Sequence, residues 1–230
     1  MCLRVELESG MTPVFPARAR LFTVNRTDPG LRFIYGAERI AAAFALLALS
    51  PVAVAIAIAI AALSRRGPLV RHARVGWRGA PLGMLKFRTM WGDRDPAGPL
   101  FTVEDVAGWV PPSKLTGDSR VNSSFAAFCR RYSLDEFPQL YHVVRGEMSL
   151  VGPRPITRAE LQCHYGDCAD EVLSVRPGLT GLWQTRGRSR LSYARRRRLD
   201  RFFVRRASVG LYLRILLRSV STVISGDGAY

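Results

Sequence analysis

The sequence is short of acidic residues for its length. Asp and Glu number 18 against 34 Lys and Arg in 230 residues, which leaves a formal net charge of +16 at pH 7. A chain this basic is expected to meet polyanions, namely nucleic acid, anionic lipid headgroups or phosphorylated substrates. Nearly half of the residues are hydrophobic (48%), which excludes a chain that is disordered throughout.

Cysteine and histidine are also scarce. The four cysteines do not show the pattern of a secreted disulfide framework, and we find no secretory signal peptide. Cys163, His164 and Cys168 lie close in sequence, but three histidines in all and no second cysteine pair argue against a four-ligand structural zinc site. We therefore expect a reducing, cytoplasmic setting.

The longest apolar run covers residues 40–63 and contains no charged residue. As a helix rising about 1.5 Å per residue, it is just long enough to span a bilayer. Ser50 and Pro51 lie near its middle, and a proline there predicts a kink. Arg39 precedes the run and Arg65 follows it, so the charges do not set an orientation. A kinked spanning helix and a hairpin that enters and leaves by one face both fit, and a buried core helix is the plain alternative.

The character of the chain changes after the apolar run. Residues 69–76 are predicted to be extended, as a short strand pair, with residues 77–79 as a loop. Residues 84–90 alternate apolar and polar side chains, so as a strand they would send Lys86 and Arg88 to the same face. A basic strand face suits a phosphate ligand, and a solvated surface is the alternative.

Two adjacent carboxylates, Asp135 and Glu136, lie in residues 133–140 (SLDEFPQL), at what is predicted to be the start of a helix. With Ser133 as the N-cap, Pro138 would cost a backbone hydrogen bond. With Asp135 as the N-cap, Pro138 lies in the first turn, where its missing N–H has no helical partner anyway. We therefore predict Asp135 as the N-cap. The carboxylates would then share the positive end of a helix, a place that suits phosphate groups.

Carboxylates, basic residues and a membrane segment together suit phosphoryl chemistry on a lipid. Carboxylates alone would repel phosphate, but Mg²⁺ is typically held by one or two carboxylates plus substrate phosphates. One carboxylate could act as a nucleophile, with arginines stabilising the transferred group. Arg154, displayed between Pro153 and Pro155, is well placed to grip an anion. The alternative for the acidic pair is a helix cap with an exposed neighbour.

The C-terminal third is predicted to be largely helical and basic. Residues 159–173 are expected to form a helix and residues 175–184 a glycine-punctuated loop and strand. A run of four arginines, residues 195–198, is expected on another helix, with its side chains pointing in several directions. Anionic headgroups are the expected partner of this run. Residues 208–224 form an amphipathic segment that fits either a membrane interface or packing on the core.

Four motifs together resemble one known family. Residues 86–90 (KFRTM), 133–140 (SLDEFPQL), 148–155 (MSLVGPRP) and 177–184 (PGLTGLWQ) occur in the family's order and at about its spacing. The chain is similar to bacterial sugar transferases, the monotopic phosphoglycosyl transferases. It is similar to the exopolysaccharide-initiating branch, which loads galactose-1-phosphate or glucose-1-phosphate onto undecaprenyl phosphate. The resemblance covers roughly residues 34–230.

The resemblance implies an α/β fold, mostly helical with a small sheet. Residues 1–33 would be a variable lead and residues 34–66 a membrane segment, re-entrant because Ser50 and Pro51 match the family's helix break. Residues 67–230 would form the catalytic domain, ending in an amphipathic helix. The protein would lie at the bacterial inner membrane, with this domain on the cytoplasmic face.

The resemblance also implies a covalent mechanism centred on the acidic pair. Asp135 would take the sugar-1-phosphate from a UDP-sugar, UMP would leave, and undecaprenyl phosphate would attack the aspartyl intermediate. Glu136 would help to bind Mg²⁺. Anionic membrane lipids and a second copy of the chain are further expected partners, and nucleic acid is not. The candidates for phosphate or nucleotide contact are Lys86, Arg88, Arg154 and Arg188.

Several positions depart from the family pattern. The chain has His72 and Ala73 where Gln-Glu is common, and Arg206 and Ala207 replace a common Asn-Trp pair. Tyr212 stands where Asp is frequent. None of these touches the acidic pair. The competing hypothesis is a membrane-anchored basic binding or scaffold protein without catalysis, which would need neither carboxylate.

Overall fold

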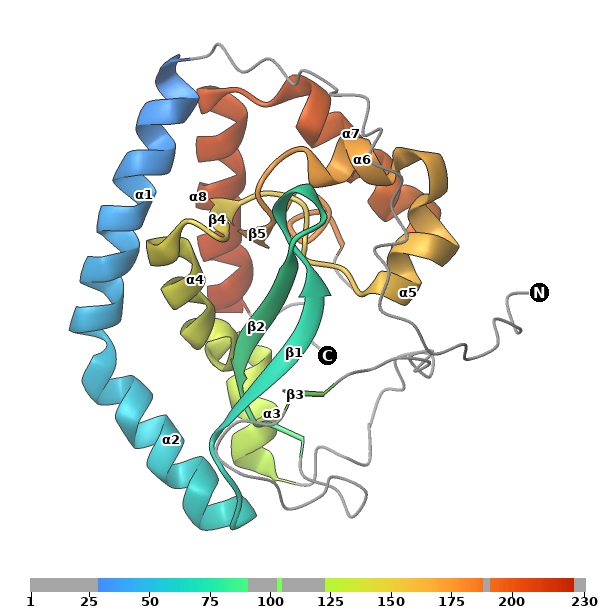
Figure 1. Cartoon of the computed structure of the whole chain (residues 1–230). Helices are drawn as coiled ribbons and strands as arrows, with labels where there is room; N and C mark the ends of the chain where they lie inside the picture. Colours follow the sequence, from blue (N-terminus) through green and yellow to red (C-terminus); the bar gives the residue numbers. More distant parts are fainter. Residues whose placement is uncertain (1–28, 91–102, 105–122, 188–190, 226–230) are drawn as a thin grey trace.

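The computed structural model describes residues 29–90, 103–104, 123–187 and 191–225. A long bent helix pair runs along one side, and a small sheet lies in the middle of the molecule (Figure 1). Shorter helices, α5 and α6, lie on the opposite side together with α7. The expected class, mostly helical with a small sheet, is confirmed.

The bent pair consists of α1 (Pro29–Ala48) and α2 (Ser50–Ser64), whose axes differ by 59°. The bend falls at Ser50 and Pro51, as predicted, with proline in the first turn of α2 and the Ser50 hydroxyl donating to the Leu47 carbonyl at 2.7 Å. Within the described ranges no single helix is long and apolar enough to cross a membrane, whereas the two halves together are. Helix α1 begins inside the range expected as the lead.

The first sheet has the strand order β2-β1-β3. Strand β1 (Leu69–Val75) pairs antiparallel with β2 (Pro81–Phe87) through a tight turn, η1 (Trp77–Gly79), and parallel with β3 (Val103–Glu104). Residues 69–76, predicted as a short strand pair, are therefore a single strand that pairs with β2, and the loop predicted over 77–79 is present as the turn. The strand predicted over 84–90 is present too, but it runs from Pro81 to Phe87. This hairpin presents the residues of β2 to the helices that follow.

Helix α3 (Ser124–Arg131) leads into η2 (Leu134–Gln139), which continues as α4 (Leu140–Arg145). The prediction that Asp135 caps an α-helix is wrong. The helical segment starts two residues earlier than predicted, at Leu134, after Ser133 in a left-handed conformation (φ 56°), and its first six residues form a 3₁₀-helix without a side-chain cap. This tighter helix places both carboxylates within the turn, where they face side chains of β2 instead of capping backbone N–H groups.

Strands β4 (Ser149–Val151) and β5 (Gly178–Thr180) form a second, parallel pair. A Cβ atom on Gly178 would lie 2.0 Å from the backbone nitrogen of Gly152, so only glycine permits this approach. The helix expected over 159–173 is present but interrupted near Gly166 (φ 46°). Its pieces are α5 (Arg158–Glu160), η3 (Leu161–Tyr165), η4 (Gly166–Cys168) and α6 (Ala169–Leu173).

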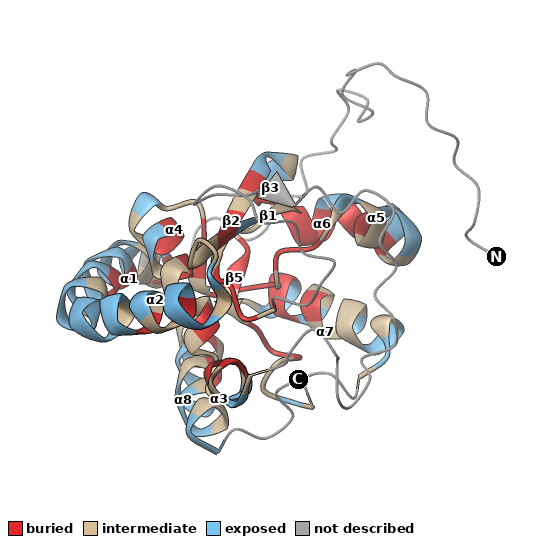
Figure 2. Ribbon diagram, turned by 90° about the horizontal axis from the view of Figure 1, so that it is seen from below, coloured by how far each residue is buried: buried red, intermediate tan, exposed pale blue. Residues whose placement is uncertain are grey.

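The last two helices are α7 (Tyr193–Arg206) and α8 (Val209–Ser225). Tyr212 and Ile215 of α8 are buried in a core shared with Leu31 of α1, Val151 of β4 and Phe203 of α7. The outward faces of α1 and α2 are exposed (Figure 2), although many of their side chains are apolar. The amphipathic C-terminal segment therefore packs one face on the core and leaves another face open.

A buried carboxylate joins α1 to this core. Glu38 Oε2 accepts hydrogen bonds from the Ser149 hydroxyl and the Leu150 N–H, both at 2.9 Å, and from the Tyr212 hydroxyl. Tyr212, a departure from the family pattern, is thus the residue through which α8 holds α1.

Candidate active site

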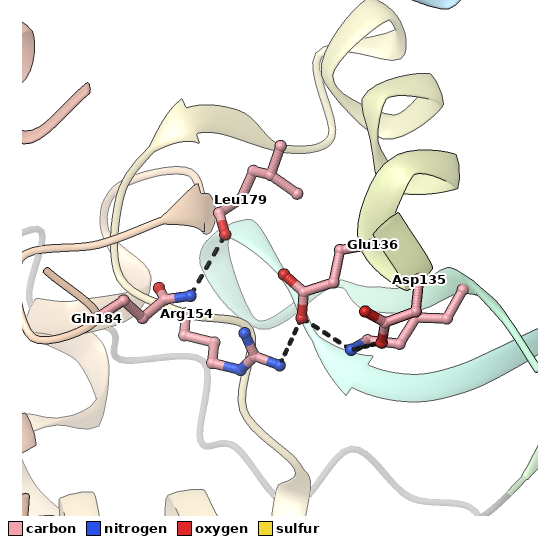
Figure 3. A network of polar contacts seen from close by, with 6 residues as sticks. Asp135, Glu136, Arg154, Leu179 and Gln184 are labelled. Carbon is pink, nitrogen blue, oxygen red and sulfur yellow. Dashed lines mark hydrogen bonds and ion pairs between the residues drawn. The ribbon is translucent and has the colours of Figure 1, made fainter. Parts of the chain in front are cut away.

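The acidic pair lies against the end of β2 (Figure 3). The ammonium group of Lys86 is 2.8 Å from Glu136 Oε1 and 3.4 Å from Asp135 Oδ2. Arg154 Nη2 donates to the same Glu136 oxygen at 3.1 Å. Asp135 is buried and Glu136 nearly so, which excludes the alternative of a helix cap with an exposed neighbour. The structure thus brings four of the predicted site residues together.

The two carboxylates differ in their electrostatic environment. Burial opposes ionisation of Glu136, but the charges of Lys86 and Arg154 outweigh it and hold the pKa of Glu136 well below its usual range. Burial raises the pKa of Asp135; Lys86 opposes this shift and the neighbouring charge of Glu136 adds to it. Glu136 is therefore a fixed anion with two cationic partners, whereas Asp135 has a single, longer contact.

His72 lies in the same basic surroundings. Burial and the charge of Lys86, with smaller contributions from Arg74, Arg154 and Arg88, lower the pKa of His72 to about 3. The imidazole is therefore neutral at pH 7. Lys86 and Arg154, which contact the carboxylates directly, carry the positive charge there.

His142 supports the site from behind, and sequence reasoning missed it. Its Nε2 accepts the Leu85 N–H at 3.2 Å, and its Nδ1 lies 2.6 Å from Glu147 Oε2. Since Nε2 is the acceptor, Nδ1 carries the proton that is donated to Glu147. This buried ring joins α4, which follows the acidic pair, to the strand residue next to Lys86. The only signal in the sequence is a histidine followed five residues later by an acid.

Two other predicted contact residues have different outcomes. Arg88 lies just beyond β2, almost fully buried, and its Nε donates to the Gly67 carbonyl at 2.9 Å. Strand β2 ends at Phe87, so Arg88 lies one residue beyond the strand that carries Lys86. A phosphate contact of Arg88 stays a prediction. Arg188 lies outside the described residues.

Gln184 is a further polar residue beside Arg154 (Figure 3). Its Nε2 donates to the Leu179 carbonyl at 3.4 Å, and its Oε1 is buried without a partner in the described part of the chain. A buried acceptor without a donor is costly, so this oxygen is a candidate for ligand contact. Gln184 closes the fourth motif, but the sequence alone did not single it out.

The donor set fits a magnesium ion shared with a substrate. Across the described ranges there is no group of three or more His, Cys, Asp or Glu side chains that could enclose a metal. Asp135 and Glu136 supply adjacent carboxylates, and Mg²⁺ usually needs only one or two of these when phosphates complete its shell. The pair therefore suits a metal that arrives with a diphosphate.

Comparison with known proteins identifies relatives over most of the chain. The family model described as "Bacterial sugar transferase" matches residues 33–226. The chain is 38% identical over 194 residues to the "Exopolysaccharide production protein ExoY" of Sinorhizobium fredii, covering 83% of this chain and 85% of that protein.

Other relatives are longer than the region they share with this chain. Identity is 41% over 173 residues to a "UDP-galactose-lipid carrier transferase" of Erwinia amylovora, covering 73% of this chain but 36% of the relative. It is 38% over 168 residues to an "Undecaprenyl-phosphate galactose phosphotransferase" of Salmonella typhimurium, covering 71% and 35%. The chain thus spans about a third of the length of these two proteins.

Proposed function

Because the chain belongs to the bacterial sugar transferase family, we propose that it is a phosphoglycosyl transferase that moves a hexose-1-phosphate from a UDP-sugar to undecaprenyl phosphate. The reaction would begin the assembly of an exopolysaccharide repeat unit. The names of two relatives support this substrate pair. The observation that carries the proposal is the buried carboxylate pair clamped by Lys86 and Arg154.

Asp135 is the better nucleophile of the two carboxylates. Glu136 is held by two cations on one oxygen, whereas Asp135 has only the 3.4 Å contact with Lys86. Burial disfavours the ionised form of Asp135 and raises its pKa, and the charges of Lys86 and, to a smaller extent, Arg130 oppose this shift and favour the carboxylate. An Asp135 oxygen attacks the phosphorus that bears the sugar, and the bond from this phosphorus to the bridging oxygen breaks.

UMP leaves with that bridging oxygen and with the electrons of the broken bond. A phosphate oxygen of undecaprenyl phosphate then attacks the same phosphorus, and the Asp135 carboxylate is released unchanged. Lys86 and Arg154 are placed to stabilise the charge on the transferred phosphoryl group. Asp135 and Glu136 would hold Mg²⁺, which would neutralise charge on the diphosphate of the donor.

The bent pair α1–α2 would place this site at the membrane. Its bend at Ser50 and Pro51 fits a re-entrant hairpin, which enters and leaves by the cytoplasmic face of the inner membrane. The lipid substrate would then reach the carboxylates from the bilayer surface, and the nucleotide sugar would reach them from the cytoplasm.

The test is UMP release by the purified full-length protein in detergent, with Mg²⁺, undecaprenyl phosphate and a panel of UDP-sugars. We expect release with at least one sugar, lost with EDTA and reduced at least about a thousandfold in Asp135→Asn. Asp170→Asn, an exposed acid on α6, is the matched control and should keep full activity. Turnover retained in Asp135→Asn would exclude Asp135 as the nucleophile. The absence of release with every sugar would exclude a UDP-sugar donor and favour the non-catalytic alternative.

A further inference from the structure

Six of the seven arginines of α7 fall into two sets, and the seventh, Arg206, is exposed at the end of the helix. Those of the first set are used within the protein. The Arg196 guanidinium lies 4.6 Å from the centre of the Trp183 ring, and Arg197 donates to the His164 carbonyl at 2.7 Å. The other members of this set, Arg201 and Arg205, both bind the carboxylate of Glu171.

The second set is Arg195 and Arg198, in the first two turns of the same helix. Both are exposed, and neither side chain has a partner in the described ranges. Like charges three residues apart on a helix repel, so this arrangement does not stabilise the fold.

Two arginines from other segments, Arg186 and Arg218, lie close to Arg195 of the second set. A surface pocket of about 440 Å³ is lined by Arg186, Arg195, Leu199 and Arg218, and a second one of about 380 Å³ beside it is lined by Arg195, Arg198 and Leu199. Arg186 and Arg218 are exposed too, with no side-chain partner among the residues that the structure describes. Among the described residues, the lining of the two pockets together therefore contains four guanidinium groups and no carboxylate.

We call the two neighbouring pockets together, lined by Arg186, Arg195, Arg198, Leu199 and Arg218, the arginine pocket. The elements that form its walls are held in place by contacts on their other side. The Ser219 and Thr180 hydroxyls lie 2.7 Å apart and join α8 to β5 next to Arg218. On α7, the ring contacts of Arg196 fix the turn that carries Arg195. The backbone that carries these arginines is thus held in place, which keeps their positive charges near one another.

The pocket adjoins the exposed apolar surface. On α8, next to the Arg218 position, an apolar stripe is open to solvent, with Leu217 at 72% exposure. Helix α8 packs against α1, whose outer face is also apolar and exposed (Figures 1 and 2). An anion that carries acyl chains could bind its charge in the pocket and its chains on this stripe, which consists of Leu213, Leu217, Val220 and Ile224.

We propose that the arginine pocket between α7 and α8 binds the headgroup phosphate of an anionic phospholipid. Arginine forks match phosphate oxygens, and four of them close together without a carboxylate in the described lining attract an anion. The site is separate from the carboxylate pair, because no residue of that cluster lines it. A lipid held there would fix how α7 and α8 sit on the membrane surface.

The test compares two double variants with the same charge change on the same two helices. Arg195→Gln with Arg218→Gln removes two pocket arginines, and Arg206→Gln with Arg214→Gln removes two exposed arginines that do not line it. Both lower the net charge from +16 to +14. Each full-length protein is titrated calorimetrically in detergent with dioctanoyl phosphatidylglycerol, dioctanoyl phosphatidylcholine or inorganic phosphate.

We expect saturable binding of phosphatidylglycerol that is weakened about thirtyfold by the pocket double variant and less than about threefold by the control. Phosphatidylcholine and inorganic phosphate should bind much more weakly. Equal losses in both variants would show diffuse attraction and overturn the pocket. Inorganic phosphate binding as tightly as the lipid would overturn the lipid assignment, and so would the absence of any binding. Turnover is not needed for this readout, so it stands or falls independently of the proposed reaction.

Discussion

The carboxylate pair and the arginine pocket treat positive charge in opposite ways. At the pair, Lys86 and Arg154 are partly buried and each contacts Glu136 within 3.1 Å. In the pocket, Arg195 and Arg218 are exposed, and no described carboxylate contacts them. At the pair, carboxylates of the protein balance the cations. In the pocket, the cations are available to an anion from outside the chain.

This difference bears on what each region requires to fold. A buried ion pair that loses one partner leaves an uncompensated charge, which costs several kcal/mol. An exposed cation without a partner costs little to remove. Substitutions at the pair should therefore damage folding and function together. Substitutions in the pocket should affect only binding.

Removal of Lys86 should have the largest effect. Lys86→Met leaves Asp135 and Glu136 without their shared cation, so we expect UMP release to fall more than about a hundredfold. The free energy of unfolding at pH 7 should fall by about 3 kcal/mol. Lys86→Arg keeps the charge and should lose much less stability, as measured by urea unfolding followed by circular dichroism. Equal stability of the Met variant and the wild type would mean that the pair is not held as described.

Removal of His142, which supports the site, should have the second-largest effect. His142→Ala leaves the Leu85 N–H without an acceptor and opens a cavity, so the unfolding free energy should fall by about 2 kcal/mol. UMP release should fall as well, because the strand that carries Lys86 loses its tie to α4. Glu147→Gln keeps an acceptor for His142 Nδ1–H and should cost less than about 1 kcal/mol. A larger loss in the Gln variant than in His142→Ala would contradict this order.

The acidic pair, its basic partners and the helix break could be predicted from the sequence because they lie in local motifs. Lys86 and Arg154 are far from Asp135 in sequence, and the family resemblance is what assigns them to the same site. The helix type around Asp135 could not be predicted, since a left-handed Ser133 and a 3₁₀ turn depend on packing against β2.

Other contacts needed the tertiary structure for a different reason. Glu38 lies in a segment dominated by apolar residues, and its partners come from β4 and α8, more than a hundred residues away. Which arginines of α7 are unpartnered depends on where Glu171 and Trp183 lie. Charge counting predicts an anionic partner, but only the folded chain separates arginines that stabilise it from those that do not.

Asp200, on the buried face of α7, allows a pH test of how burial affects an ionisable side chain. Burial raises the pKa of Asp200 to about 7, and hydrogen bonding by Tyr165 only partly opposes this shift. Since the folded state binds the proton more tightly than the unfolded state, stability falls as pH rises from about 4 to about 7. Asp200→Asn cannot ionise and still accepts from Tyr165. We expect its stability relative to the wild type to be about 2 kcal/mol higher at pH 8 than at pH 5.5. A pH-independent difference in urea unfolding would exclude ionisation of Asp200 in this range.

The smallest effect on stability is expected for the double variant of the arginine pocket, although it removes two surface charges. Arg195→Gln with Arg218→Gln should change the unfolding free energy by less than about 0.5 kcal/mol in lipid-free detergent, because neither guanidinium has a described partner to lose. The same variant should gain less stabilisation than the wild type when dioctanoyl phosphatidylglycerol is added, since a ligand stabilises only the state that binds it. A loss of several kcal/mol without lipid would instead assign these arginines to the fold, as at the carboxylate pair. The difference between the two regions would then lie in how deeply the charges are buried and not in what they bind.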